Sequence, residues 1–115
     1  MSREYKIYAV DFDGTLCVES FPEIGAPNTE LIAFLREERK LGNKVILWTC
    51  RVADRLQEAV SWCKEQGLEF DTVNANIPEM LEYWGNDPRK VFADIYIDDK
   101  ALINSQYCVP FKEEL

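Results

Sequence analysis

Two pairs of aspartates are the residues of this sequence best suited to chemistry. Asp11 and Asp13 are separated by one residue, and Asp98 and Asp99 are adjacent. Neighbouring carboxylates repel each other, so each pair is costly unless a cation or a shared proton offsets the repulsion. Mg²⁺ prefers one or two carboxylates together with water and phosphate oxygens. The two pairs therefore indicate a site for Mg²⁺ and a phosphorylated ligand, whereas either pair taken alone is equally compatible with an acidic loop cap.

Each aspartate pair directly follows a segment that is typical of a β-strand. Residues 5–10 are rich in strand-forming residues, and the apolar segment 95–97 leads into the second pair. In a parallel sheet, ligands bind in the crevice beyond the carboxyl ends of the strands. Gly14 lets the backbone turn sharply after the first pair. We therefore expect a buried strand before each pair, with all four carboxylates gathered at one edge of the sheet.

A hydroxyl group and two cations complete the candidate site. Thr49 follows the apolar run 45–48, so it also stands at the end of a predicted strand. A hydroxyl group with a nearby backbone N–H can bind a phosphoryl oxygen, although a threonine there can equally be a simple cap. Thr49, Cys50 and Arg51 are therefore candidate substrate-binding residues. Charge on a transferring phosphoryl group calls for a cation besides the metal, and Lys90 ranks first for that role, ahead of Arg51.

Strands and helices are expected to alternate along the chain, which is typical of a parallel sheet with helices on both faces. The predicted strands are 5–10, 45–48, 70–73 and 91–97, with a short edge strand near Cys108, and the predicted helices are about 29–41, 53–66 and 79–84. The first two helices carry apolar residues at helical spacing, namely Leu31, Ile32, Leu35, Leu41, Leu56, Ala59, Val60 and Cys63. We expect an α/β, three-layer Rossmann-like architecture.

Composition excludes several other classes of protein. The chain has 115 residues, of which 47% are hydrophobic, so residues 1–115 are expected to form a single domain with one core. Thirteen basic and twenty-one acidic residues give a net charge of −8, which argues against a long nucleic-acid footprint and against binding to an anionic membrane. The chain contains no histidine, which excludes His-based triads and most zinc sites.

The cysteines and the short apolar runs indicate a cytoplasmic protein. Cys17, Cys50, Cys63 and Cys108 form no C-x-x-C pair, which favours four reduced thiols over a zinc or redox motif. No apolar run approaches the roughly 20 residues that span a bilayer, and the first 16 residues do not form a signal peptide.

The segments DFDGTL, ILWT and IYIDD, with a lysine upstream of the last, resemble the haloacid dehalogenase-like (HAD) hydrolase superfamily over residues 5 to about 100. The resemblance implies a Rossmann-like sheet in the strand order 5-4-1-2-3. It also implies that Asp11 is the nucleophile, Asp13 the general acid/base and Lys90 the stabilising cation, with Thr49 as a phosphate ligand. The implied Mg²⁺ ligands are Asp11, Asp13 through its backbone carbonyl, Asp98 and Asp99.

Asp13 narrows the expected reaction within that superfamily. A nucleophilic carboxylate that attacks phosphorus forms an aspartyl-phosphate, which divides one difficult displacement into two easier steps. A second carboxylate can protonate the leaving alkoxide and later deprotonate water. Members that cleave carbon–halogen bonds do not need this acid, so Asp13 favours a Mg²⁺-dependent phosphomonoester hydrolase.

The spacing of the motifs leaves no room for a cap domain, so we expect an open site. Only the loop from Val18 to Pro27 can cover it, with Phe21 and Ile24 either at its mouth or in the core. An open site suits a large phosphorylated substrate, or a homo-oligomer in which a second subunit closes it.

Two alternatives remain open at this point: a HAD-like binding or regulatory module with little turnover, and a phosphatase for polymer ends such as nucleic-acid or glycan phosphates. Trp48, Asn74 and Asn76 are weaker candidates for substrate contact.

Overall fold

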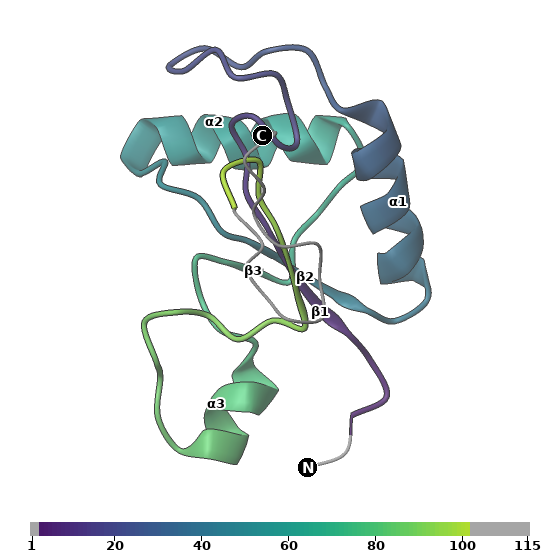
Figure 1. Ribbon diagram of the computed structural model, residues 1–115, viewed down its shortest axis with the longest axis vertical. Helices are drawn as coiled ribbons and strands as arrows, with labels where there is room; N and C mark the ends of the chain where they lie inside the picture. Colours follow the sequence, from purple (N-terminus) through teal and green to yellow (C-terminus); the bar gives the residue numbers. More distant parts are fainter. Residues whose placement is uncertain (1–2, 102–115) are drawn as a thin grey trace, which may run out of the picture.

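A parallel β-sheet of four strands forms the centre of the computed structural model, which describes residues 3–101 (Figure 1). The strands are β1 (Ile7–Val10), β2 (Lys44–Leu47), β3 (Thr72–Val73) and β4 (Ile95–Ile97). They lie in the order β3-β2-β1-β4, which agrees with the neighbours predicted for these four strands. The fold is therefore α/β and Rossmann-like. The edge strand expected near Cys108 lies outside the described residues, so the five-strand order stays a prediction.

Three helices connect the strands, close to the positions expected from the sequence. They are α1 (Thr29–Lys40), α2 (Ala53–Glu65) and α3 (Pro78–Trp84). The side-chain oxygen of Asn28 accepts a hydrogen bond from the backbone N–H of Leu31 at 3.2 Å, so Asn28 caps α1. α3 has Pro78 in its first turn and ends at Gly85, which adopts a left-handed conformation.

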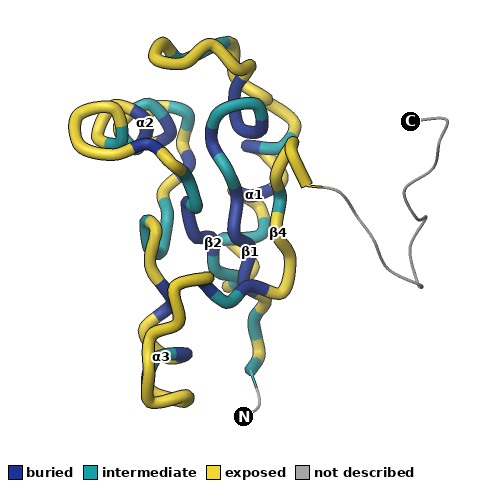
Figure 2. The backbone as a smooth tube through the Cα atoms, turned by 60° about the vertical axis from the view of Figure 1, so that its left-hand side comes forward, coloured by how far each residue is buried: buried dark blue, intermediate teal, exposed yellow. Residues whose placement is uncertain are grey.

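Side chains of β1 and β2 alternate between two hydrophobic clusters, because successive residues of a strand point to opposite faces of the sheet. One cluster joins β1 and β2 to α1 and α2; it includes Tyr8, Val10, Ile32, Leu35, Val45, Leu47, Ala59 and Cys63. The other joins the same strands to α3; it includes Ile7, Ala9, Ile46, Ile77 and Met80. β1 is buried along its whole length (Figure 2), so the strand that leads into Asp11 is held from both faces.

The expectation of a buried strand over 91–97 was wrong in two respects. Only Ile95–Ile97 pair with β1, and both Ile95 and Tyr96 are 40% exposed. The residues before them make one backbone hydrogen bond to β1, from the Asp94 N–H to the Ile7 carbonyl at 2.8 Å. Side chains hold the rest, because the Asn76 side chain accepts from the Phe92 N–H and the Asp94 carboxylate accepts from the Ile7 N–H. The prediction that Leu41 lies on the inner face of the first helix was also wrong. Leu41 follows the last helical residue and is 75% exposed.

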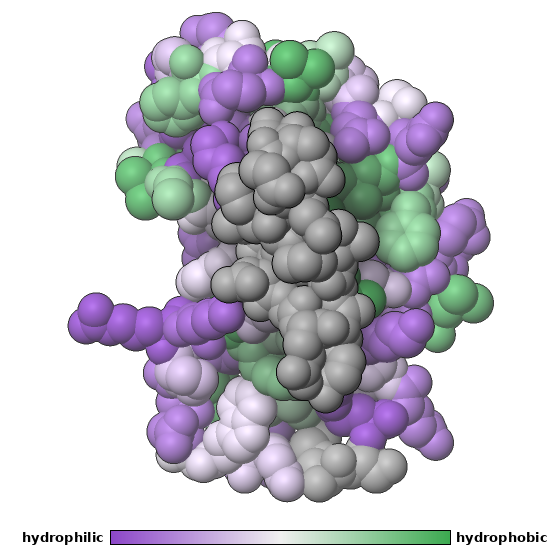
Figure 3. Space-filling model, in the orientation of Figure 1, coloured by the Kyte–Doolittle hydropathy of each residue, from purple (hydrophilic) through white to green (hydrophobic). Residues whose placement is uncertain are grey.

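Exposed hydrophobic side chains are scattered over the visible face in Figure 3 and are separated by polar groups. Such isolated exposure is ordinary for a folded protein and does not mark an interface. Within residues 3–101, none of the helices is both long and apolar enough to cross a membrane.

Candidate functional site

Three of the four predicted carboxylates meet at the carboxyl edge of the central strands. Asp11 follows β1, and its backbone N–H donates to the Ile97 carbonyl at 2.9 Å, so the ends of β1 and β4 lie side by side. Asp98 and Asp99 come directly after β4. Oxygen atoms of Asp11, Asp98 and Asp99 all lie within 4.8 Å of one another. The sheet therefore brings together two segments that are more than 80 residues apart in the sequence.

The backbone around Gly14 and Thr15 fixes the position of Asp99. Gly14 has a φ of +80°, and a Cβ at this position would lie 2.8 Å from the Asp99 side-chain carboxyl carbon. The buried Thr15 hydroxyl accepts a hydrogen bond from the Asp99 backbone N–H at 3.1 Å. Gly14 is therefore required both by its conformation and by the close approach of the carboxylate. Sequence reasoning had identified the turn at Gly14 but gave Thr15 no role.

Mutual repulsion and burial shift the ionisation of Asp11. The pKa of Asp11 is raised from 3.8 to about 6, chiefly by burial and in smaller part by the nearby charges of Asp98, Asp99 and Asp13, against a lowering by the Phe12 backbone N–H. Burial and like charges both penalise the ionised form of a carboxyl group. A bound cation would remove this penalty, so the electrostatics of the cluster fit a metal ligand set.

Lys100 is the lysine that adjoins the carboxylate cluster. Its ammonium lies 3.2 Å from an Asp99 carboxylate oxygen, and this hydrogen bond is the largest cause of the lowered pKa of Asp99. Lys90, which ranked first from the sequence, instead lies with its ammonium 4.8 Å from the centre of the Tyr96 ring. Lys90 lines neither of the two cavities that contain Asp11. The signal for Lys100 was its position directly after the second aspartate pair.

Thr49 is held at the end of β2 by its neighbours. The Asn74 side-chain oxygen accepts a hydrogen bond from the Thr49 backbone N–H at 2.8 Å, and the Thr49 hydroxyl accepts one from the Arg51 backbone N–H at 3.2 Å. Asn74 has a φ of +52°, a conformation that asparagine tolerates better than most residues. Asn74 therefore orients Thr49, and this role does not require Asn74 itself to contact a substrate.

Asp13 turns toward Arg51 rather than toward the three-carboxylate cluster. The Arg51 guanidinium donates two parallel hydrogen bonds to the Asp13 carboxylate, at 2.9 and 2.8 Å. This bidentate geometry is the strongest form of a charged pair between these side chains. The hydrogen bond to Asp13 is also the largest cause of the raised pKa of Arg51.

Two adjoining cavities, of about 480 and 340 Å³, open over these residues. We call them together the acidic cavity. They share Asp11, Thr49, Cys50 and Lys100, and their other lining residues are Asp13, Glu19, Phe21, Trp48, Arg51 and Asp98.

The weaker candidates divide between the cavity and the core. Phe21 and Trp48 line the acidic cavity, whereas Ile24 packs against the core. Asn76 is buried and its side chain bonds to Asp87, Pro88 and Phe92. The structure therefore gives Asn76 a role in holding the segment before β4.

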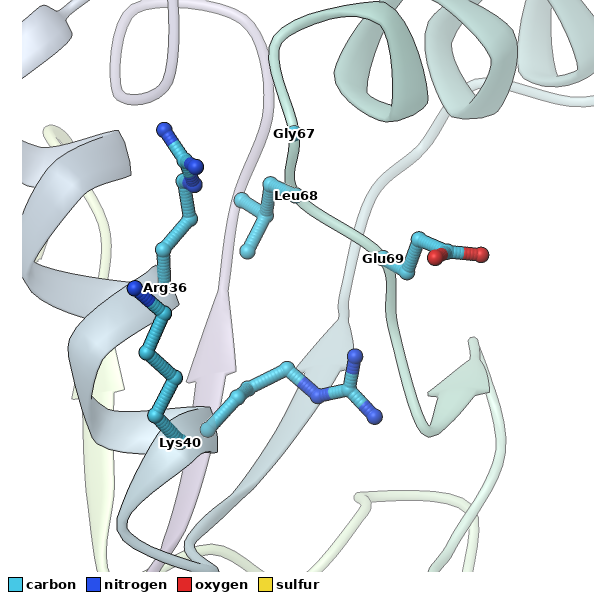
Figure 4. Close-up of a pocket in the computed structure, with 6 residues that line it drawn as sticks. Arg36, Lys40, Gly67, Leu68 and Glu69 are labelled. Atoms are coloured by element: carbon cyan, nitrogen blue, oxygen red, sulfur yellow. The ribbon is translucent and has the colours of Figure 1, made fainter.

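A further cavity lies between the last turns of α1 and the segment 67–69 that follows α2. This basic cavity, of about 300 Å³, is lined by Arg36, Arg39, Lys40, Gly67, Leu68 and Glu69. Figure 4 shows Arg36 and Lys40 extending from the same side of α1, with Glu69 pointing away from both. Arg39 is paired with Asp71 at 3.1 Å, and Lys40 is paired with Glu37 at 3.2 Å.

Comparison with known proteins identifies one informative relative. No family model matches the chain, and a search of curated proteins finds no match. Among solved structures, the chain is similar to a conserved protein from Bacteroides thetaiotaomicron, with a TM-score of 0.75 and 37% sequence identity. The similarity covers 85% of this chain and 78% of that protein. At this identity and coverage, the chain belongs to the same family as the conserved Bacteroides thetaiotaomicron protein.

Proposed function

We propose that the protein is a Mg²⁺-dependent phosphomonoester hydrolase of the HAD type. The observation that carries the proposal is the convergence of Asp11, Asp98 and Asp99 within 4.8 Å, because Asp11 and Asp98 line one open cavity together with Thr49 and Lys100. The resemblance of DFDGTL, ILWT and IYIDD to HAD hydrolases supports the same reaction and, for the whole chain, three layers with the strand order 5-4-1-2-3. A carboxylate nucleophile, a phosphate-binding hydroxyl and a cation are the groups this reaction needs.

The reaction divides into two displacements at phosphorus. In the first, an Asp11 carboxylate oxygen bonds to phosphorus and the ester P–O bond breaks, and Asp13, which starts the cycle protonated, gives its proton to the leaving alkoxide. In the second, Asp13 takes a proton from water as the water oxygen bonds to phosphorus, and the Asp11–phosphorus bond breaks to release phosphate. Thr49 and Lys100 hold the phosphoryl oxygens during both steps. Asp13 ends each cycle in the state in which it began.

The residues present fit a magnesium ion. Asp11, Asp98 and Asp99 supply the hard oxygen ligands that Mg²⁺ prefers, and the charges of Asp98 and Asp99 contribute to the raised pKa of Asp11, so a bound cation would favour its ionised form. When bound, Mg²⁺ supplies charge neutralisation for the phosphoryl group and for these carboxylates.

The open cavity favours a phosphorylated substrate with a bulky leaving group. Within residues 3–101, the chain between β1 and β2 consists of a loop and α1, and no additional domain covers the cavity. Phe21 is 57% exposed at the cavity wall and offers an apolar surface to the leaving group. A second subunit covering this opening is compatible with the same geometry.

Substitution of the nucleophile tests the proposal directly. Asp11→Asn should lower Mg²⁺-dependent phosphate release from a panel of sugar phosphates, nucleotides and oligonucleotide ends by roughly 10³-fold or more, since the amide is a poor nucleophile. Asp87→Asn is the matched control, because Asp87 lies outside the acidic cavity and bonds to Asn76. Wild-type turnover by Asp11→Asn would exclude Asp11 as nucleophile. Tight ligand binding without phosphate release by the native protein would instead favour a binding module.

The two lysines offer a second, matched comparison. Lys100→Ala should reduce kcat/KM for the same substrates by tenfold or more, at about 1.4 kcal/mol per tenfold, because the developing phosphoryl charge loses its cation. Lys90→Ala should leave kcat/KM nearly unchanged, since its ammonium lies over Tyr96. The reverse result would restore Lys90 to the role implied by the HAD resemblance.

A further inference from the structure

Arg51 is almost completely enclosed, although it was expected to contact the substrate. Only 1% of its side chain is exposed. Its Nε and Nη2 donate to the Asp13 carboxylate, Nη2 also donates to the Glu23 carbonyl at 3.0 Å, and Nη1 donates to the Pro22 and Arg55 carbonyls at 3.3 and 3.5 Å. A guanidinium has five N–H donors. All five donors therefore have protein acceptors, and no N–H donor of Arg51 is left to bind a substrate phosphate.

The same guanidinium also joins two aromatic rings. Its central carbon lies 5.0 Å from the ring centre of the buried Phe12 and 5.0 Å from that of Phe21. Such contacts between a cation and the face of a ring are attractive. Phe21 belongs to the loop of residues 18–27, and this loop forms part of the wall of the acidic cavity.

The base of loop 18–27 is held by the backbone, whereas its middle is held by Arg51. Cys17 forms a bridge with Pro27, and the Val18 N–H donates to the Ala26 carbonyl at 2.8 Å. Between these points, Phe21, Pro22 and Glu23 each contact the Arg51 guanidinium. One buried side chain thus joins the cavity wall to Asp13.

We propose that Arg51 is a positioning residue that fixes Asp13 and loop 18–27 relative to each other. This inference rests on the proposed function for its kinetic part, because Asp13 is there the group that moves protons. The two parallel hydrogen bonds fix the carboxylate plane and leave each Asp13 oxygen a further lone pair for water or for the leaving group. A lysine at this position would keep the charge, but it would lose the fixed planar geometry.

The two reaction steps depend differently on the position of Asp13. An aryl phosphate leaves as a stable phenolate, so forming the aspartyl-phosphate on Asp11 does not need a proton from Asp13. Breaking the aspartyl-phosphate needs Asp13 to take a proton from the attacking water. Displacing Asp13 should therefore slow the second step alone for such a substrate, and the aspartyl-phosphate should accumulate.

Rapid-mixing kinetics with a nitrophenyl phosphate and Mg²⁺ tests this consequence. Arg51→Lys should release a burst of about one nitrophenolate per protein molecule, followed by a steady rate roughly ten- to a hundredfold below the wild type, as expected for a misplaced catalytic group. Arg55→Lys is the matched control, because the Arg55 side chain pairs with Glu58 on the surface of α2. A reduced burst with an unchanged rate per active site would show a merely structural role and overturn the inference.

Hydrogen exchange supplies a readout that does not depend on turnover. The backbone amides of the non-proline residues in loop 18–27 should exchange roughly fivefold faster or more in Arg51→Lys and at the wild-type rate in Arg55→Lys. Unchanged exchange in Arg51→Lys would overturn the inference even if the protein is an active phosphatase. Faster exchange in a protein without any phosphatase activity would contradict the proposed function and retain the link between Arg51 and the loop.

Discussion

The acidic cavity lies beyond the carboxyl ends of the central strands, and the basic cavity lies beside the last turns of α1. The two cavities differ in how their charges are balanced. In the basic cavity, Arg39 and Lys40 each have a carboxylate partner, in Asp71 and Glu37. Arg39 and Lys40 also lie in the last turn of α1, where cations are favoured by the helix dipole. Arg36 is the one cation of this cavity without a carboxylate partner among residues 3–101, and its side chain is exposed to solvent.

The acidic cavity holds more like charge than its own cations offset. Asp11, Asp98 and Asp99 lie within 4.8 Å of one another, and Lys100 is the cation that pairs with this cluster. Arg51 is already engaged with Asp13. An accumulation of charge therefore points to a ligand only where the protein leaves that charge unbalanced. Asp11 is the partly buried member of the acidic cluster, whereas unpaired Arg36 is exposed, so the acidic cavity is the better candidate for the ion that the proposed function requires.

A pair of glycine substitutions tests the difference in rigidity between the cavities. Gly14 and Gly67 have similar φ values, +80° and +86°, and each approaches a charged side chain. Gly67→Ala should cost about 1 kcal/mol from backbone strain, because the Arg36 guanidinium ends a flexible side chain and can move away. Gly14→Ala should cost about 1–3 kcal/mol more, because Asp99 is held by Thr15 and is not free to shift.

Chemical denaturation of both variants measures this difference, with Gly85→Ala as the control, since a Cβ on Gly85 would meet nothing within 4 Å. Equal losses of unfolding free energy for Gly14→Ala and Gly67→Ala would show that the acidic cavity is no more rigid than the basic one.

Magnesium should stabilise the protein through the acidic cavity alone. At a Mg²⁺ concentration of 100 times Kd, binding adds about 2.7 kcal/mol to the unfolding free energy and raises Tm accordingly. The double substitution Asp98→Asn and Asp99→Asn should abolish this increase. The double substitution Arg36→Ala and Lys40→Ala should retain it in full. A thermal shift that survives loss of both aspartates would place the ion elsewhere.

The pH dependence of stability should identify Asp11 in the metal-free protein. Because the pKa of Asp11 is about 6 in the folded state and 3.8 in its ordinary state, the folded protein binds this proton more tightly than the unfolded chain. The unfolding free energy should therefore fall as the pH rises from about 4 to about 6, and then level off. Asp94, whose pKa is lowered by its hydrogen bond from Arg3, acts with the opposite sign below pH 3.8.

Denaturation in the presence of a chelator at pH 4.5, 5.5 and 6.5 measures this slope, and Asp11→Asn should flatten it. If Asp11→Asn left the slope of unfolding free energy against pH unchanged, Asp11 would not be the group that causes this pH dependence. This is the smallest of the expected effects, because Asp11 is only partly buried and solvent screens its neighbours.

The local parts of the fold follow directly from the sequence. The helices expected near 29–41 and 79–84 are present, because the Asn28 cap, Pro78 in the first turn of α3 and the terminating Gly85 each act on close neighbours in the chain. Placing Asp11 and Asp98 at one edge also needs only the rule that parallel strands end together. Strand lengths were less predictable, because the segment before β4 is held by the distant side chain of Asn76.

What the sequence alone determined is which residues stand at strand ends, since chain order and alternation set those positions. What the tertiary structure decided is which charges face each other. Arg51 and Asp13 are 38 residues apart, and no periodic pattern predicts their bidentate contact. The choice between Lys90 and Lys100 likewise depends on where β4 begins and ends. The sequence indicates which residues are suited to chemistry, but the ion-pair partner of a long side chain such as Arg51 depends on how the core packs.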